Sequence, residues 1–209
     1  MSVLSELAPN LEARECEYLT HIIRSWDLLA DLSFADLLLC IPDDQASITS
    51  YTIVAHVRPT TSRSIYRTEM EGRRFAEGER PFFDQARQSR TMVDGGLILQ
   101  TPVERIRTLS VPVVFEGKVL AVMSRDFSPD DQRVAGELEM TYFSLFRRLA
   151  LMITQDCYPF QDADTETEFS PRVSDGLMLL DADGRVRFAS PNSVSVLSRL
   201  HIRQIEGKK

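Results

Sequence analysis

The stretch from Val111 to Arg125, VPVVFEGKVLAVMSR, decides the fold. Every second residue from Leu109 to Phe115 is apolar, which is typical of a β-strand with one buried face. Glu116 and Gly117 follow as turn residues, because glycine adopts the left-handed backbone that a tight hairpin needs. The run from Val119 to Met123 is apolar throughout, which indicates a strand covered on both faces. The stretch therefore predicts a β-hairpin whose second strand lies inside a sheet.

A second pair of strands is predicted nearer the amino terminus. Residues Phe34 to Ile41 form an apolar run that only Asp36 interrupts, and Pro42 to Asp44 have turn composition. Tyr51 to Val57 is again rich in β-branched and aromatic residues. We expect these two runs to pair in antiparallel fashion. From position 58 to 106 the pattern is weaker and predicts a short strand near Ile65 and Tyr66 and a short helix from Pro81 to Ser89.

Two helices are expected to flank the sheet. Apolar residues at helical spacing predict an amphipathic helix from Leu11 to Asp31. Ser128 as the cap and Pro129 at the first position predict a longer helix that ends near Asp156. This second helix has two apolar faces, so we expect one to cover its own sheet and the other to pack on the first helix or on the same helices of another protomer. The alternative is burial on all sides within one monomer.

The carboxyl-terminal stretch from Asp175 to Leu197 has the pattern strand, turn, strand, helix. Asp183-Gly184 suits a tight hairpin turn, and Ser190-Pro191 suits a helix start. A hairpin with one helix is not stable alone in water, so it needs a partner surface or a continuation after Lys209. The acidic, aperiodic stretch from Gln161 to Phe169 before it is typical of a linker.

The composition limits the class of protein. The chain has 209 residues and 43% hydrophobic residues, which predicts one full domain plus an extension. No apolar run approaches the ~20 residues that span a bilayer, and the first residues lack the pattern of a signal peptide, so we expect a cytoplasmic protein without membrane contact. A net charge of -7 argues against nucleic acid as a partner. Cys16, Cys40 and Cys157 match neither a disulfide framework nor a metal site.

An antiparallel sheet with flanking helices is an α+β layout, and it resembles a GAF domain. Three stretches are similar to the amino-terminal sensor region of actinobacterial GAF-PAS histidine kinases: Trp26 to Asp36, Val111 to Arg125 and Ser170 to Asn192. Asn192 falls where the PAS family carries an asparagine. The resemblance implies a GAF-like domain with terminal interface helices at 1–157, an acidic linker at 158–173 and the start of a truncated PAS domain at 174–209.

The resemblance also implies a function, the signal-input region of a cytosolic two-component histidine kinase. Such a region senses a cytosolic small molecule or another cue and passes it through dimeric helices to a kinase domain. The histidines, His21, His56 and His201, lack the surroundings of a phosphoacceptor, and no phosphate-binding motif is present, so we expect no catalysis and no cofactor in this chain. ATP and magnesium are expected only for the kinase domain, through which a response regulator of the antiterminator type would bind.

Ligands of GAF domains bind between the sheet and the variable segment, here residues 58–106. Arginines and aromatic residues in this segment could hold a small anionic or nucleotide ligand; the candidates are Arg58, Tyr66, Arg67, Phe75, Phe82 and Arg105. The alternative is a solvated basic loop that its own glutamates neutralise. For the homodimer interface the candidates are Leu19, Ile22, Trp26, Leu138, Tyr142, Leu145 and Leu149.

Two other functions stay open from the sequence. A GAF module without a ligand could serve as a scaffold or dimerisation unit, and a pocket filled by the chain's own side chains would support it. A small enzyme of the methionine-sulfoxide-reductase kind would need a reactive cysteine, for which Cys40 is the candidate.

Overall fold

The computed structural model describes residues 3–44, 46–100, 103–129, 136–158 and 170–202. The chain divides into two compact units, Met1–Ser170 and Pro171–Lys209, which are described separately. Most of the predicted linker, residues 159–169, lies outside the described part of the chain.

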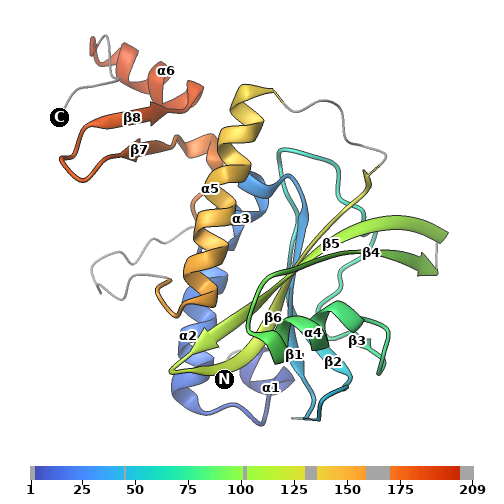
Figure 1. Ribbon diagram of the computed structural model, residues 1–209. Helices are drawn as coiled ribbons and strands as arrows, with labels where there is room; N and C mark the ends of the chain where they lie inside the picture. The colour runs from blue at the N-terminus through green and yellow to red at the C-terminus, as the bar shows by residue number, and fades with distance from the viewer. Residues whose placement is uncertain (1–2, 45, 101–102, 130–135, 159–169, 203–209) are drawn as a thin grey trace. The chain divides into compact units, whose positions relative to one another are not determined.

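The larger unit is built on a six-stranded antiparallel sheet with the strand order β3-β2-β1-β6-β5-β4 (Figure 1). The strands are β1 (Asp36–Pro42), β2 (Tyr51–Val57), β3 (Arg74–Phe75), β4 (Val93–Gln100), β5 (Val103–Phe115) and β6 (Lys118–Phe127). The two predicted strand pairs are confirmed, and they meet at the centre of the sheet, where β1 pairs with β6. Glu116 and Gly117, both with positive φ, form the turn of the β5-β6 hairpin as predicted.

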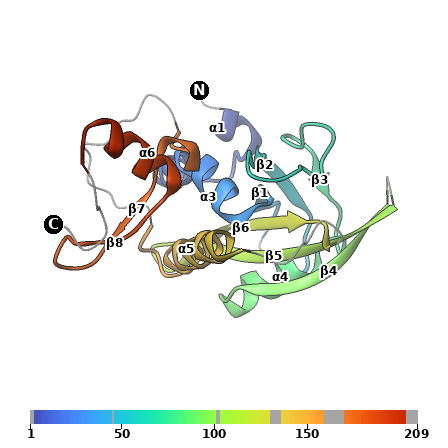
Figure 2. The same cartoon turned by 90° about the horizontal axis from the view of Figure 1, so that it is seen from above.

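Helices cover both faces of this sheet. The helices of the larger unit are α1 (Val3–Leu7), α2 (Ala13–Arg24), α3 (Trp26–Ser33), α4 (Pro81–Ser89) and α5 (Glu137–Thr154). Consecutive residues of β6 point to opposite faces of the sheet. Arg125 contacts Ser33 at the end of α3, whereas Asp126 contacts Arg80 at the start of α4. Figure 2 shows α3 and α4 on opposite sides of β5 and β6.

The helix predicted from Leu11 to Asp31 is interrupted at Ser25. There α2 ends and α3 begins, and the side-chain hydroxyl of Ser25 donates to the backbone oxygen of Ile22. The predicted start of the long helix at Ser128 was also wrong, since α5 begins after Gly136, whose extended backbone precedes the first helical turn. Residues 130–135 between these two positions lie outside the described part of the chain.

In the middle segment, α4 has the predicted bounds, but the strand predicted near Ile65 and Tyr66 does not form. The short strand lies instead at Arg74–Phe75. Strand β4 was not predicted, because its two glycines hide the strand pattern. Gly95 has a packing reason: a Cβ built there would lie 2.4 Å from the ring of Phe82.

The smaller unit contains the predicted hairpin and helix. Its elements are a 3-10 helix (Val173–Asp175), β7 (Met178–Leu180), β8 (Val186–Ala189) and α6 (Pro191–Arg199). Ser190 caps α6 by accepting from the backbone nitrogen of Ser193, as predicted. Asn192 donates from its side-chain amide to the backbone oxygen of Ser174, at 2.8 Å. These local elements are confirmed, and their assignment to a PAS domain stays a prediction.

Candidate functional site

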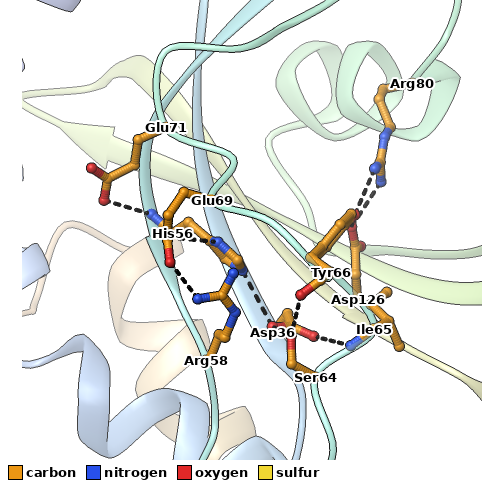
Figure 3. Close-up of polar contacts among 10 residues, drawn as sticks. All are labelled: Asp36, His56, Arg58, Ser64, Ile65, Tyr66, Glu69, Glu71, Arg80 and Asp126. Carbon is orange, nitrogen blue, oxygen red and sulfur yellow. Dashed lines mark hydrogen bonds and ion pairs between the residues drawn. The ribbon is translucent and has the colours of Figure 1, made fainter.

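A buried polar network lies on the α4 face of the sheet, and its centre is an ion pair between Arg80 and Asp126. Both side chains are almost fully buried, and Nη1 of Arg80 lies 2.9 Å from Oδ2 of Asp126. Tyr66 joins them: its hydroxyl donates to Asp126 Oδ2 at 2.5 Å and accepts from Nη2 of Arg80 at 2.8 Å (Figure 3). Three residues from the middle segment and β6 therefore form one closed cluster.

The protein compensates the buried charges of this cluster. Burial raises the pKa of Asp126, but the attraction of Arg80 and hydrogen bonds from Ser124, Thr108 and Tyr66 outweigh it and hold the pKa below its usual value. The guanidinium of Arg80 also lies 4.1 Å from the ring centroid of Phe75 and 5.5 Å from that of Phe83. Burial and the charge of Asp126 raise the pKa of Tyr66 far above its ordinary value, so the tyrosine stays protonated as a donor.

A second set of contacts, centred on Asp36 of β1, fixes the chain around residues 64–66. One carboxylate oxygen of Asp36 accepts from the hydroxyl of Ser64, and the other accepts from the backbone nitrogen of Ile65, both at 2.7 Å. Nε2 of His56 lies 3.2 Å from the first oxygen, and the imidazole meets the ring of Tyr66 edge to face. Asp36 thus ties the middle segment to the centre of the sheet.

Apolar side chains fill the space around this network. Buried residues of β1, β2, β6, the middle segment and α4 form one cluster: Leu38, Cys40, Tyr51, Ile53, Tyr66, Met70, Phe75, Phe83 and Val122. This cluster includes buried side chains of the middle segment and of the sheet, between which a GAF ligand was expected. Burial also raises the pKa of the Cys40 thiol far above its ordinary value, which argues against a reactive cysteine there. Among the described residues, no group of histidines, cysteines and carboxylates has the arrangement of a metal site.

The six predicted ligand residues lie in different surroundings. Tyr66 and Phe75 belong to the closed cluster, and Phe82 packs on Gly95. Arg58 pairs with Glu69 at the surface, as the alternative of a neutralised loop expects. The side chains of Arg67 and Arg105 are exposed.

Sequence reasoning missed the four residues that organise the network, Asp36, His56, Arg80 and Asp126. Two of them had a signal in the sequence. Asp36 interrupts an otherwise apolar run, and Asp126 comes three residues after the apolar run from Val119 to Met123. Both acids are buried in the structure. Arg80 and His56 were also missed, and their partners Asp126 and Asp36 lie 46 and 20 positions away along the chain.

The candidate interface residues fall into two groups. The side chains of Leu19, Ile22 and Trp26 are fully buried within one chain, which leaves them no surface for a partner. Tyr142 is also buried, with its ring stacked on Phe34. The remaining three lie on α5 and stay predicted interface residues, since Leu138 is 38% exposed and Leu145 and Leu149 are half-buried.

With the fold and network established, comparison with known proteins decides the family. A family model described as "Histidine kinase PdtaS, GAF domain" matches residues 1–145. The chain belongs to this family. The match confirms the predicted GAF sensor region.

The PdtaS relatives extend well beyond this chain. It is 28% identical over 209 residues to the sensor histidine kinase PdtaS of Mycolicibacterium smegmatis, and 30% identical over 216 residues to that of Mycobacterium tuberculosis. These alignments cover 96% and 99% of this chain, but 41% and 42% of the two kinases. More than half of the length of each PdtaS relative thus has no counterpart in these 209 residues.

A solved structure agrees with this assignment to the PdtaS family. It is the sensor region of a sensor histidine kinase, with 29% sequence identity and a TM-score of 0.77. The superposition covers 99% of this chain and 72% of that chain. Within the described residues of this PdtaS-family chain, no helix has both the length and the apolar character needed to cross a membrane.

Proposed function

We propose that this chain is the signal-input region of a cytosolic two-component histidine kinase and that it transmits a cue through a pair of α5 helices. The observation that carries the proposal is the arrangement of α5. One face of this helix packs on α3 and β5, while apolar side chains next to that face remain partly exposed. Membership of the PdtaS sensor family supports the same function.

The exposed stripe of α5 has the spacing of a helix-helix seam. The buried face consists of Tyr142, Phe146, Ala150 and Ile153. Leu138, Leu145 and Leu149 follow one another at intervals of seven and four residues, so they form a stripe on one side of that face. The same stripe of a second protomer would cover it in a two-fold symmetric dimer.

Such a seam could carry a signal. Two packed helices can adopt discrete arrangements, and a ligand that binds one arrangement more tightly shifts the population towards it. We propose that the corresponding full-length kinase uses ATP and magnesium to phosphorylate a histidine outside these residues. The phosphoryl group would then pass to a response regulator of the antiterminator type.

A second candidate function has its own supporting observation. Because the cluster of Tyr66, Phe75 and Phe83 fills the expected GAF ligand space, the unit could act as a dimerisation scaffold without a ligand at that place. The scaffold and the signal-input region share the α5 seam, and they differ in whether a ligand changes its arrangement.

The seam is tested with Leu145→Glu in analytical ultracentrifugation of the 209-residue chain. We expect the wild type to sediment as a dimer and the variant to weaken dimerisation by about tenfold or more, because a buried charge without a partner costs over 1.4 kcal/mol. Met140→Glu is the matched control, since it places the same charge on another side of α5, where Met140 is 58% exposed. A dimer that withstands Leu145→Glu would contradict the proposed seam, and so would a dimer that Met140→Glu weakens as much as Leu145→Glu does.

The signalling function is tested by placing this chain in front of the remainder of M. smegmatis PdtaS, in place of the matching region. We expect the chimera to autophosphorylate, and the Leu145→Glu version to lose most of that activity while Met140→Glu keeps it. If the Leu145→Glu chimera lost its dimer but autophosphorylated as well as the unsubstituted and Met140→Glu chimeras, the seam would not control the kinase.

A further inference from the structure

A groove lies on the face of the sheet that α3 and α5 cover, opposite the buried pair of Arg80 and Asp126. Its volume is about 500 Å³, within the range of small-molecule sites. The groove runs between α5 and the turn that joins α4 to β4, and its floor includes β5 and β6. The lining residues that matter here are Arg90, Met92, Arg125, Phe143, Arg147 and Leu151.

The innermost cation of the groove is Arg125, which is 7% exposed. Its Nε and Nη2 both donate to the backbone oxygen of Ser33, at 3.0 and 2.7 Å. The guanidinium lies 4.0 Å from the ring centroid of Phe127 and 4.7 Å from that of Phe143. Hydrogen bonds and aromatic rings therefore fix the position of the charge.

Among the residues that the structure describes, Arg125 has no counter-ion of its own. The two carboxylates that attract it most are already paired, Asp94 with Arg107 and Asp126 with Arg80. Within the described residues, no carboxylate lies at ion-pair distance from Arg125. Burial lowers the pKa of this arginine to about 10 despite that attraction, which is the mark of an incompletely compensated cation.

The rest of the lining adds positive charge and apolar surface. Arg90 and Arg147 are exposed cations at the rim, whereas Asp94 is the one carboxylate among the described lining residues. Met92 and Phe143 are partly buried, and Leu151 is 44% exposed, which is high for a large apolar side chain. A ligand that matches this lining carries a negative charge at one end and an apolar body.

We propose that the groove between α5 and β4 binds a small amphiphilic monocarboxylate, whose carboxylate pairs with Arg125 and Arg147 and whose apolar chain lies on Met92, Phe143 and Leu151. The exposed guanidinium of Arg147 suits a carboxylate because it presents two parallel donors. Nε and Nη2 of Arg125 already donate to Ser33, so Arg125 would attract the carboxylate through its charge and its remaining nitrogen, Nη1. The apolar chain would cover side chains that are otherwise in contact with water.

Such a ligand would connect α5 to the edge of the sheet and so could shift the arrangement of the α5 seam. This consequence rests on the proposed function, whereas the binding itself does not. Binding is measured on the isolated chain, so it can fail while the α5 dimer persists, and the dimer can fail while binding persists.

The test uses decanoate as the probe and the full 209-residue chain in isothermal titration calorimetry, below the micelle concentration of the probe. We expect saturable binding by the wild type and affinity about tenfold or more weaker for Arg147→Glu, since the exposed side chain changes sign without loss of packing. Arg67→Glu is the matched control, because it makes the same charge change on an exposed residue of the middle segment; its affinity should stay within about twofold. Arg125→Met should also lose binding. If the Arg125→Met variant does not fold, the Arg147→Glu variant still tests the proposal.

Two further probes separate the parts of the proposed ligand. Decanol tests whether the charge is needed, and acetate tests whether the apolar chain is needed; we expect neither to displace decanoate at equal concentration. Absence of decanoate binding, equal affinity of wild type and Arg147→Glu, or equal binding of decanol would each overturn the proposal.

Discussion

Arg125 and Asp126 are neighbours on β6, yet they face two different environments. Asp126 points to the α4 face, where Arg80 and Tyr66 pair with it and aromatic rings close the space. Arg125 points to the α3 and α5 face, where no carboxylate of the described part of the chain pairs with it and a groove begins. The difference is that buried aromatic and apolar side chains surround the charge on one side of the sheet, whereas a groove borders the charge on the other.

The contrast has a simple structural origin. Successive residues of a strand point to opposite faces of the sheet. Because Arg125 and Asp126 are adjacent in β6, their charges lie on opposite faces. A buried charge needs compensation, and within the described ranges an ion pair supplies it on the α4 face only. The expected effects of mutations on the two faces therefore differ in size, and the predictions test that difference.

The largest effect is expected from Asp126→Ala, which leaves Arg80 buried without a counter-ion. Removing one partner of a buried pair costs about 3–5 kcal/mol, so we expect a loss of that size in the free energy of unfolding, measured by urea denaturation. Asp94→Ala is the control, because it breaks the exposed pair with Arg107 and should change stability by less than about 1 kcal/mol. If both variants lost the same free energy of unfolding, the buried pair of Asp126 would contribute no more to stability than the exposed pair of Asp94.

The acid dependence of stability should report the same buried pair. Because the pKa of Asp126 is lower in the folded chain than its ordinary value of 3.8, the unfolded chain takes up the proton first as the pH falls. The stabilisation is therefore complete above pH 3.8 and is lost as the pH drops through the folded pKa. In denaturation at several pH values, the gap between wild type and Asp126→Asn should shrink below pH 3.8, and a constant gap would argue against the ionised pair.

A smaller effect is expected from Arg125→Met on the open face. The variant leaves the backbone oxygen of Ser33 without its two donors, but it also removes a buried charge that lacks a counter-ion. Since the two changes have opposite signs, we expect a loss of about 1–2 kcal/mol, roughly the cost of an unsatisfied buried acceptor. A loss as large as that of Asp126→Ala would show that Arg125 is a structural ion-pair partner and not an uncompensated charge.

The sequence was sufficient for elements with local signals. The hairpin of β5 and β6, strand β2 and helix α4 carry alternation, turn glycines or a starting proline within a few residues. Strand β4 lacks such a signal because Gly95 is needed for the ring of Phe82. The break at Ser25 was missed because the apolar spacing continues through it into α3.

The candidate site was harder to predict because its contacts are long-range. Arg80 and Asp126 are 46 positions apart, and Tyr66 and Asp126 are 60 apart, so no short motif joins them. Aromatic residues and arginines in the middle segment looked like a ligand site, although several of them fill the core. An apolar stripe also does not say what covers it: Leu19, Ile22 and Trp26 pack inside the chain, whereas Leu145 remains half-buried.

The most direct test of the account is a map of amide chemical shifts in the 209-residue chain as decanoate is added. The account predicts that the shifts concentrate on the groove, at Met92, Arg125, Phe143 and Arg147, while Tyr66, Phe75 and Arg80 stay unchanged. Shifts that concentrate on the last three residues would contradict it, because they would show that the face described as closed is the one that admits a ligand.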